Sequence, residues 1–148
     1  MNPHLFIVNV EAAIIKGDRY LMITRSEQES HAGGTLSMVG GKVDPIQADV
    51  DNDAILETTI RREIREEVGV EVADSMIYVE SKAFSVEHVQ VIDVVFMCEY
   101  RSGEPRAIDP AEVEAVHWLT AQEIYDHPKT PPWIRQSIEK SEQLRNNK

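Results

Sequence analysis

The stretch REIREEVGV, residues 62–70, decides the fold that we predict for this chain. At about 100° of rotation per residue, a helix over this stretch places Glu63, Glu66 and Glu67 on one side, three and four positions apart. Like charges at these spacings repel and destabilise a helix by roughly 0.2–0.5 kcal/mol per pair. A positive group is therefore expected between the three carboxylates.

The same helix carries an apolar face that includes some of its acids. With Ile64 set at zero, Ile60 and Val68 project at about 320° and 40°, which predicts a stripe that packs on a core. Glu67 projects at about 300°, inside this stripe, and Glu63 borders it at about 260°. A carboxylate turned toward an apolar layer must be neutralised, paired or bound to a metal. Oxygen ligands, with no His cluster nearby and one cysteine in the chain, favour Mg2+ or Mn2+ over zinc.

The alternative interpretation is a charged surface helix whose acids pair with Arg61, Arg62 and Arg65. The residues upstream favour the metal interpretation. Gly40 and Gly41 follow a short extended segment, residues 35–39, and are expected to form a glycine turn.

Residues 40–43, GGKV, followed by a loop and then by residues 62–70, resemble the signature of the Nudix hydrolases. This signature is written G-x5-E-x7-R-E-U-x-E-E-x-G-U, where U is an aliphatic residue, and its second half is matched at every fixed position. The resemblance implies an α/β fold, an α/β/α sandwich with a mixed sheet between helices, formed by residues 1–148 as a single domain.

The loop between the two halves of the signature is longer than in the family. The family places its glycine fourteen positions before the arginine, whereas Gly41 lies 21 positions before Arg62. The stretch from Asp44 to Asp53 therefore contains about seven extra residues. We interpret it as a solvated bulge, with an active-site lid as the alternative.

The first glutamate of the signature would stand at Ala54, so that acid is missing from its expected place. In the family this glutamate helps to orient the arginine. Asp53 or Glu57 is expected to substitute for it, from the first helical turns. For residues 51–53, helix capping is the alternative interpretation, because short polar side chains cap helices well.

The resemblance implies roles for the residues that match the signature. Glu66 and Glu67 are expected to bind the divalent ion, with the carbonyl of Gly41 as a further ligand. Glu63 is expected to be either another ligand or the base that takes the proton of the attacking water. Arg62 is expected to hold a neighbouring carboxylate, and an ordinary intrahelical pair with Glu66 is the alternative.

Further site residues are expected outside the helix. Glu112 and Glu114, before the last strand, are candidate metal ligands, with solvated loop acids as the alternative. Arg25 and His88, on or beside strands, are candidates for substrate binding, and plain surface groups are the alternative for both. The remaining substrate-binding candidates are Gly40 and Gly41. Trp118 is interpreted as a core residue rather than a platform for a base.

The patterning predicts an alternation of strands and helices. Strands are expected over residues 6–15, 20–25, 76–84, 89–100 and 114–119, and helices over residues 54–68, 121–125 and 131–144. Residues 16–19 have the composition of a hairpin turn. Gly69 is expected to end the long helix, and Thr120 to cap the short one.

Composition narrows the function. The chain of 148 residues has a formal charge of −11, from 15 basic and 26 acidic side chains. This balance disfavours nonspecific binding to nucleic acid or to an acidic membrane, and a polyanionic substrate would need metal ions to offset repulsion. No basic leader and no apolar stretch of about 20 residues is found. With Cys98 as the single cysteine, in an apolar run, we expect a cytoplasmic protein with a buried, inert thiol.

Together these features predict a metal-dependent pyrophosphohydrolase. Its substrate would be a nucleoside triphosphate or a nucleoside diphosphate derivative, and its products a nucleoside monophosphate with pyrophosphate or with a phosphorylated product. The alternatives are a catalytically inactive nucleotide-binding module, suggested by Ala54, and an enzyme like isopentenyl-diphosphate isomerase, for which Cys98 is a poor catalytic candidate. RNA decapping is disfavoured by the acidic charge. A homodimer is one expected assembly, as in many relatives.

Overall fold

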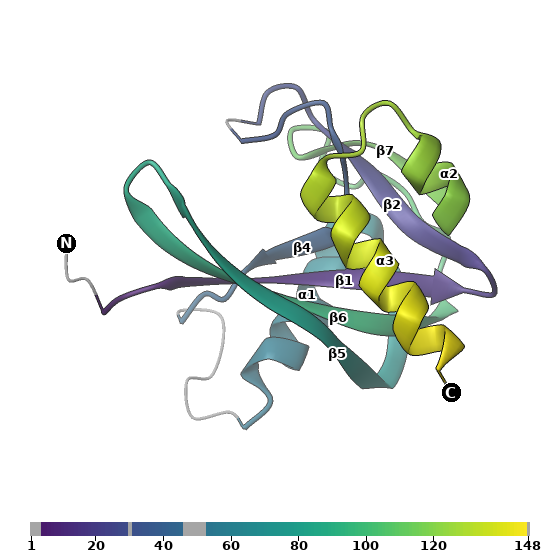
Figure 1. The fold of residues 1–148 in the computed structure, drawn as a ribbon, viewed down its shortest axis with the longest axis horizontal. Coiled ribbons are helices and arrows are strands. Elements are labelled where there is room, and N and C mark those ends of the chain that lie inside the picture. Colours follow the sequence, from purple (N-terminus) through teal and green to yellow (C-terminus); the bar gives the residue numbers. More distant parts are fainter. Residues whose placement is uncertain (1–3, 30, 46–52, 148) are drawn as a thin grey trace.

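A computed structural model describes residues 4–29, 31–45 and 53–147 of the chain. Its strands form a 7-stranded mixed sheet with α1 on one face and α2 and α3 on the other, which confirms the predicted α/β/α sandwich (Figure 1). The elements are β1 (Ile7–Lys16), β2 (Arg19–Arg25), β3 (Leu36–Ser37), β4 (Val39–Lys42), α1 (Ile55–Val68), β5 (Glu71–Val86), β6 (Val89–Ser102), β7 (Val113–Thr120), α2 (Ala121–Asp126) and α3 (Pro132–Asn146).

The strand β1 organises the sheet. It runs parallel to β6 and antiparallel to β2 and β4. The strands β5 and β6 form a long antiparallel hairpin whose turn projects beyond the helical layers at the left of Figure 1. β7 pairs with β2, on the opposite side of β1 from the β5–β6 hairpin.

Alternation along β1 divides the interior into two cores, because successive side chains of a strand point to opposite faces. Val10 packs with Ile60 and Ile64 of α1, in the position that the helical stripe predicts. Ala13 packs with Ile134 and Ile138 of α3 in the second core. The odd-numbered side chains of β1 therefore face the α3 layer.

The predicted glycine turn is wrong, because Gly40 and Gly41 lie inside β4. They pair with Glu11 and Val10 of β1. Their φ angles are not positive, in contrast to Gly69. Glycine is needed here because neighbouring atoms approach too closely for a side chain, and not because the chain reverses.

The caps of the helices agree with the sequence, except at the start of α1. Gly69 ends α1 in the left-handed conformation, with φ of 71°, and Thr120 caps α2 in a capping box. The residue at the N-cap of α1 is Ala54, so Asp53 stands one residue before the cap. Asp51, Asn52 and most of the inserted loop lie outside the described residues.

Other differences are small. β5 begins at Glu71 rather than at residue 76, because register irregularities near Val72 and Met76 interrupt its alternation. Cys98 is buried, and burial raises the pKa of its thiol to about 12, which fits an inert group. Trp118 is half-buried against the first core, as predicted. None of the helices in the described part of the chain is long and apolar enough to cross a membrane.

Candidate functional site

The contact between α1 and β4 positions two carboxylates. The backbone N–H of Gly40 donates a hydrogen bond to Oε2 of Glu67 at 3.2 Å. Gly41 lies against Glu63, and a Cβ at this glycine would stand 2.6 and 2.8 Å from the two carboxylate oxygens. The glycine pair therefore admits the acids of α1 to the edge of the sheet.

These acids lie close enough to perturb one another. Burial, together with the charges of Glu63 and Glu112, raises the pKa of Glu67 to about 8, although the hydrogen bond from Gly40 opposes the rise. Burial also raises the pKa of Glu63, where Arg62 opposes the effect and Glu66 and Glu112 add to it. Carboxylates that resist ionisation in this way favour the arrival of a cation.

Arg62 holds one of these acids and approaches another. Its Nη2 donates to Oε1 of Glu63 at 3.2 Å, and its Nε lies 3.9 Å from Oε1 of Glu66. Within the described chain its ion-pair partners are these two glutamates, and neither Asp53 nor Glu57 is among them. The buried Nε has no hydrogen-bond partner there.

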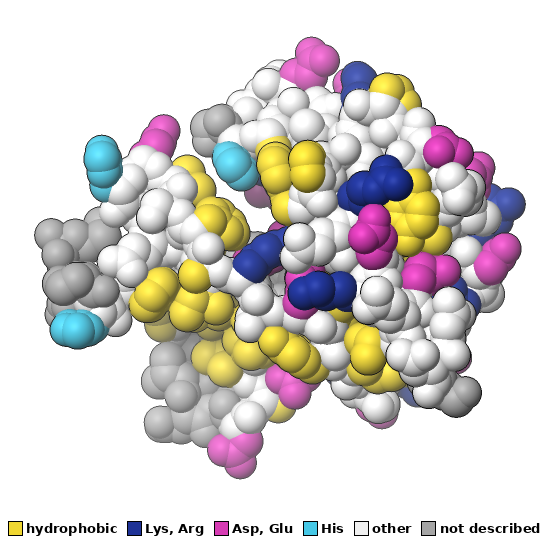
Figure 2. Space-filling view, viewed as in Figure 1, with side chains coloured by type: hydrophobic (Ala, Val, Ile, Leu, Met, Phe, Trp, Pro, Cys, Tyr) yellow, Lys and Arg dark blue, Asp and Glu magenta, His cyan; other side chains and the backbone are white. Residues whose placement is uncertain are grey.

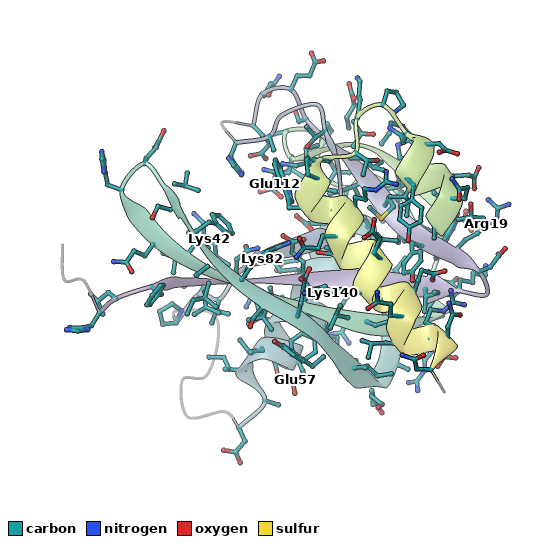
Figure 3. All side chains as sticks on the ribbon, in the orientation of Figure 1. Arg19, Lys42, Glu57, Lys82, Glu112 and Lys140 are labelled. Atoms are coloured by element: carbon teal, nitrogen blue, oxygen red, sulfur yellow. The ribbon has the colours of Figure 1, made fainter. Side chains whose placement is uncertain are left out.

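The two loop acids differ in their placement. Glu112, labelled in Figure 3, precedes β7, and its charge acts on both Glu63 and Glu67. Burial and the charges of neighbouring acids raise its own pKa. Both side chains are exposed, but Glu114, on β7, is not among the main charges that act on Glu63 and Glu67. The structure thus brings Glu112 toward the helix acids.

We tested whether these residues fit a divalent ion. No three His, Cys, Asp or Glu side chains among the described residues already converge as a metal cluster. The donor set is nevertheless all oxygen, which suits hard divalent cations. Glu63 and Glu67, both on α1, contact the glycines of β4, and their pKa values are raised. The site therefore fits such an ion once the carboxylate side chains turn toward it.

A cavity of about 730 Å3 lies on the α3 face of the sheet, and we call it the sheet cavity. It occupies the hollow between the projecting hairpin and the body of the molecule in Figure 2. Lys42 of β4 and Lys82 of β5, both labelled in Figure 3, are among its lining residues. Arg25 also lines it, and the charge of Arg25 acts on Glu67 and Glu11. Arg25, which pairs with Glu29 at 3.5 Å, therefore lines the cavity within electrostatic range of Glu67.

His88 lies beside strands, in the turn between β5 and β6, with φ of 68°. It lines a separate hollow with Phe6 and Phe84 rather than the sheet cavity. The floor of the sheet cavity includes Asn9, Glu11 and Asp93, which are not among the candidates that the sequence motif predicts. The available signal was an acid inside each of two apolar strands, Glu11 in NVEAA and Asp93 in VIDVV.

The NUDIX domain family model matches residues 6–140. The chain belongs to the Nudix family. No curated protein matches its sequence significantly. Among solved structures, the MutT NUDIX hydrolase from Burkholderia pseudomallei is similar at 25% identity, with a TM-score of 0.74, over 93% of this chain and 98% of that chain. The MutT protein from Methanosarcina mazei Go1 has 22% identity and a TM-score of 0.76, over 100% of both chains.

A third Nudix relative was solved with a nucleotide. The NUDIX domain of Shewanella oneidensis NrtR, complexed with ADP ribose, has 16% identity and a TM-score of 0.76, over 97% of this chain and 93% of that chain. Pyrophosphohydrolase activity is general in the Nudix hydrolases, and they generally use divalent metal ions. The present chain is thus a Nudix-type hydrolase by family and by fold.

Proposed function

We propose that this Nudix domain hydrolyses a phosphoanhydride bond of a nucleoside triphosphate or of a nucleoside diphosphate derivative, with Mg2+ or Mn2+. The observation that carries the proposal is the pair Glu63 and Glu67, which contact Gly41 and Gly40 of β4. Arg25, whose charge acts on Glu67, also lines the sheet cavity. The cavity volume of about 730 Å3 lies in the range of small-molecule sites, roughly 300–1,000 Å3. The ADP-ribose complex of a Nudix relative supports this substrate class.

Each residue of the site has a separate role in the proposed reaction. Glu66 and Glu67 hold the divalent ion with the carbonyl of Gly41, and Glu63 serves as a further ligand or as the base. The bound ion supplies positive charge against the phosphate oxygens. Arg25 reaches the phosphate chain from the cavity side, where it adds positive charge together with Lys42 and Lys82. Arg62 positions Glu63 through the hydrogen bond at 3.2 Å.

The other proposed residues have supporting or undecided roles. Glu112 is proposed as a further ligand, because its charge acts on Glu63 and Glu67. Glu114 as a ligand and His88 as a substrate-binding residue stay predictions. A triphosphate would yield a monophosphate and pyrophosphate, and a sugar-linked diphosphate two monophosphates.

The single buried cysteine suits a reducing compartment, which supports a cytoplasmic location. Formation of a homodimer stays a prediction.

A phosphate-release screen tests the proposal. Nucleoside triphosphates, nucleotide sugars, dinucleoside polyphosphates and coenzymes are incubated with and without Mg2+. We expect one substrate class to be cleaved only with the metal. Glu67→Gln should lower kcat at least about 100-fold, because a ligand charge is lost, and should keep or raise Tm. The matched control is Glu99→Gln on the exposed part of β6, which should behave like the parent.

Two outcomes would contradict the proposal. Cleavage that is equally fast without divalent ions would remove the metal from the reaction. Binding of nucleotides and metal without turnover of any substrate would identify an inactive binding module instead.

A further inference from the structure

The floor of the sheet cavity contains a pair of acids, of which Asp93 is buried and Glu11 is half-buried. Asn9 and Glu11 come from β1, and Asp93 comes from β6, where it stands opposite Asn9 in the parallel register. The amide of Asn9 donates to Oδ1 of Asp93 at 2.6 Å. Asp93 is 1% exposed, and Glu11 and Asp93 interact directly with each other. All three side chains line the cavity.

The remaining oxygens of this pair lack donors. Oε2 of Glu11 and Oδ2 of Asp93 are buried without a hydrogen-bond partner in the part of the chain that the structure describes. Lys82 stands opposite Asp93 on β5, but its Nζ also lies 3.3 Å from the carbonyl oxygen of Trp133. The same Nζ is 3.5 Å from Glu80, so its charge is shared with another acid.

The protonation of the pair follows from its surroundings. Burial raises the pKa of both Glu11 and Asp93, and the nearby charge of Lys82 opposes this rise. Two adjacent carboxyl groups in such a place hold one proton between them. A group that enters the cavity can therefore accept this proton from the pair and donate a hydrogen bond to the carboxylate that is left.

Aromatic side chains flank this polar floor. Trp133 at the start of α3 is 45% exposed and Phe84 on β5 is 41% exposed, and both line the cavity. His31 stacks on Trp133, with ring centroids 6.4 Å apart and planes 19° apart. Exposed aromatic faces beside a hydrogen-bonding floor suit a planar heterocycle, because the ring stacks while its edge is read.

We propose that the sheet cavity selects nucleotides whose base carries an exocyclic amino group beside a ring nitrogen, and that Glu11 and Asp93 read this edge. The inference rests on the proposed hydrolysis of nucleotides and adds the base to it. The amino group donates to a carboxylate oxygen, while the ring nitrogen accepts the shared proton or, in guanine, donates a second hydrogen bond. A base without the amino group leaves a buried acceptor unpaired, which costs about tenfold or more in affinity.

Pairs of nucleotides that differ at the amino group provide the test. The values of kcat/KM are measured for CTP against UTP and for GTP against ITP. We expect the amino-bearing member to be favoured about tenfold or more in at least one pair. Glu11→Gln and Asp93→Asn should move that ratio toward one, because the amides change the donors and acceptors at nearly constant shape. Glu99→Gln, a charge change on the exposed end of β6, should leave the ratio unchanged.

Measurements of nucleotide binding test the inference independently of the proposed hydrolysis. The dissociation constants of CMP, UMP, GMP and IMP are measured by calorimetry without metal, on variants whose thermal unfolding confirms that they are folded. Equal kcat/KM and equal binding within both pairs would overturn the inference while leaving hydrolysis intact. A ratio that neither variant changes would also overturn it. If no nucleotide is cleaved, the proposed function fails, and the binding ratios alone decide the inference.

Discussion

Gly41 lies directly against the carboxylate of Glu63, so neither residue has room to move toward the other across the contact of β4 with α1. A Cβ at Gly41 would stand 2.6 and 2.8 Å from the carboxylate oxygens. Gly41→Ala is therefore expected to displace Glu63 and lower kcat by about 100-fold, because small misplacements at a reacting centre are costly. Stability should fall by only about 1 kcal/mol, the low end for overpacked contacts, because the added methyl group meets the end of a flexible side chain that can swing aside. Steady-state kinetics and urea unfolding give the two values.

A second glycine provides the control for this substitution. Gly17, in the hairpin turn, has φ of 64° and nothing within 4 Å of an added Cβ. Gly17→Ala should cost about 1 kcal/mol through backbone strain alone, with unchanged kcat. If Gly41→Ala kept the parent rate while losing stability, the contact with Glu63 would have no part in the reaction.

The raised pKa of Glu67 predicts how the stability of the metal-free protein depends on pH. Its folded-state pKa of about 8 exceeds its ordinary value of 4.5, so the folded state binds the proton more tightly than the unfolded state. The stabilising contribution is fully present below pH 4.5 and is lost as pH rises toward 8. We expect Tm in EDTA to fall across this window, and Glu67→Gln to fall less steeply. Equal slopes for parent and variant would contradict the assignment.

Added divalent ion should oppose this pH effect. Metal binding requires ionised carboxylates and releases protons, so the stabilisation by Mn2+ should grow as pH rises from 5 to 8. Thermal unfolding at several Mn2+ concentrations measures it. Stabilisation by Mn2+ that is as large in Glu67→Gln as in the parent would place the ion elsewhere.

The sequence predicted the parts of the molecule that depend on local chemistry. The stripe of Ile60, Ile64 and Val68, the left-handed Gly69 and the capping box at Thr120 all follow from short-range pattern, and all are found. The second half of the Nudix signature could be read for the same reason, because its spacing is fixed by one helix.

What the sequence could not show depends on pairing between distant strands. The local sequence predicts a turn at Gly40 and Gly41. The residues that come close to them lie on β1 and α1, far away in the chain, so the local sequence could not show this contact. Asn9 and Asp93 meet only through the parallel register of β1 and β6. A parallel register is set by the whole sheet rather than by neighbouring residues, so the floor of the cavity had no local signal beyond two acids in apolar strands.

Glu112 and Glu114 can be separated by matched substitutions. Glu112→Gln removes a charge that acts on Glu63 and Glu67, so it should lower the pKa of both acids and slow turnover by about 10-fold or more. Glu114→Gln, on the exposed side of β7, should leave turnover near that of the parent. The measurement is the pH profile of kcat at saturating Mg2+. Loss of activity in Glu114→Gln alone would reverse the assignment of the two acids.

Arg62 acts through Glu63 and Glu66, which it contacts, and not through the acids near the start of α1. Its Nη2 lies 3.2 Å from Glu63, whereas neither Asp53 nor Glu57 is an ion-pair partner of it in the described chain. Arg62→Lys cannot keep the planar geometry of the guanidinium, so kcat should fall by about 10-fold with little change in KM. Asp53→Ala and Glu57→Ala should stay close to the parent. A slow Glu57→Ala beside a normal Asp53→Ala would instead show that Glu57 replaces the signature glutamate that Ala54 lacks.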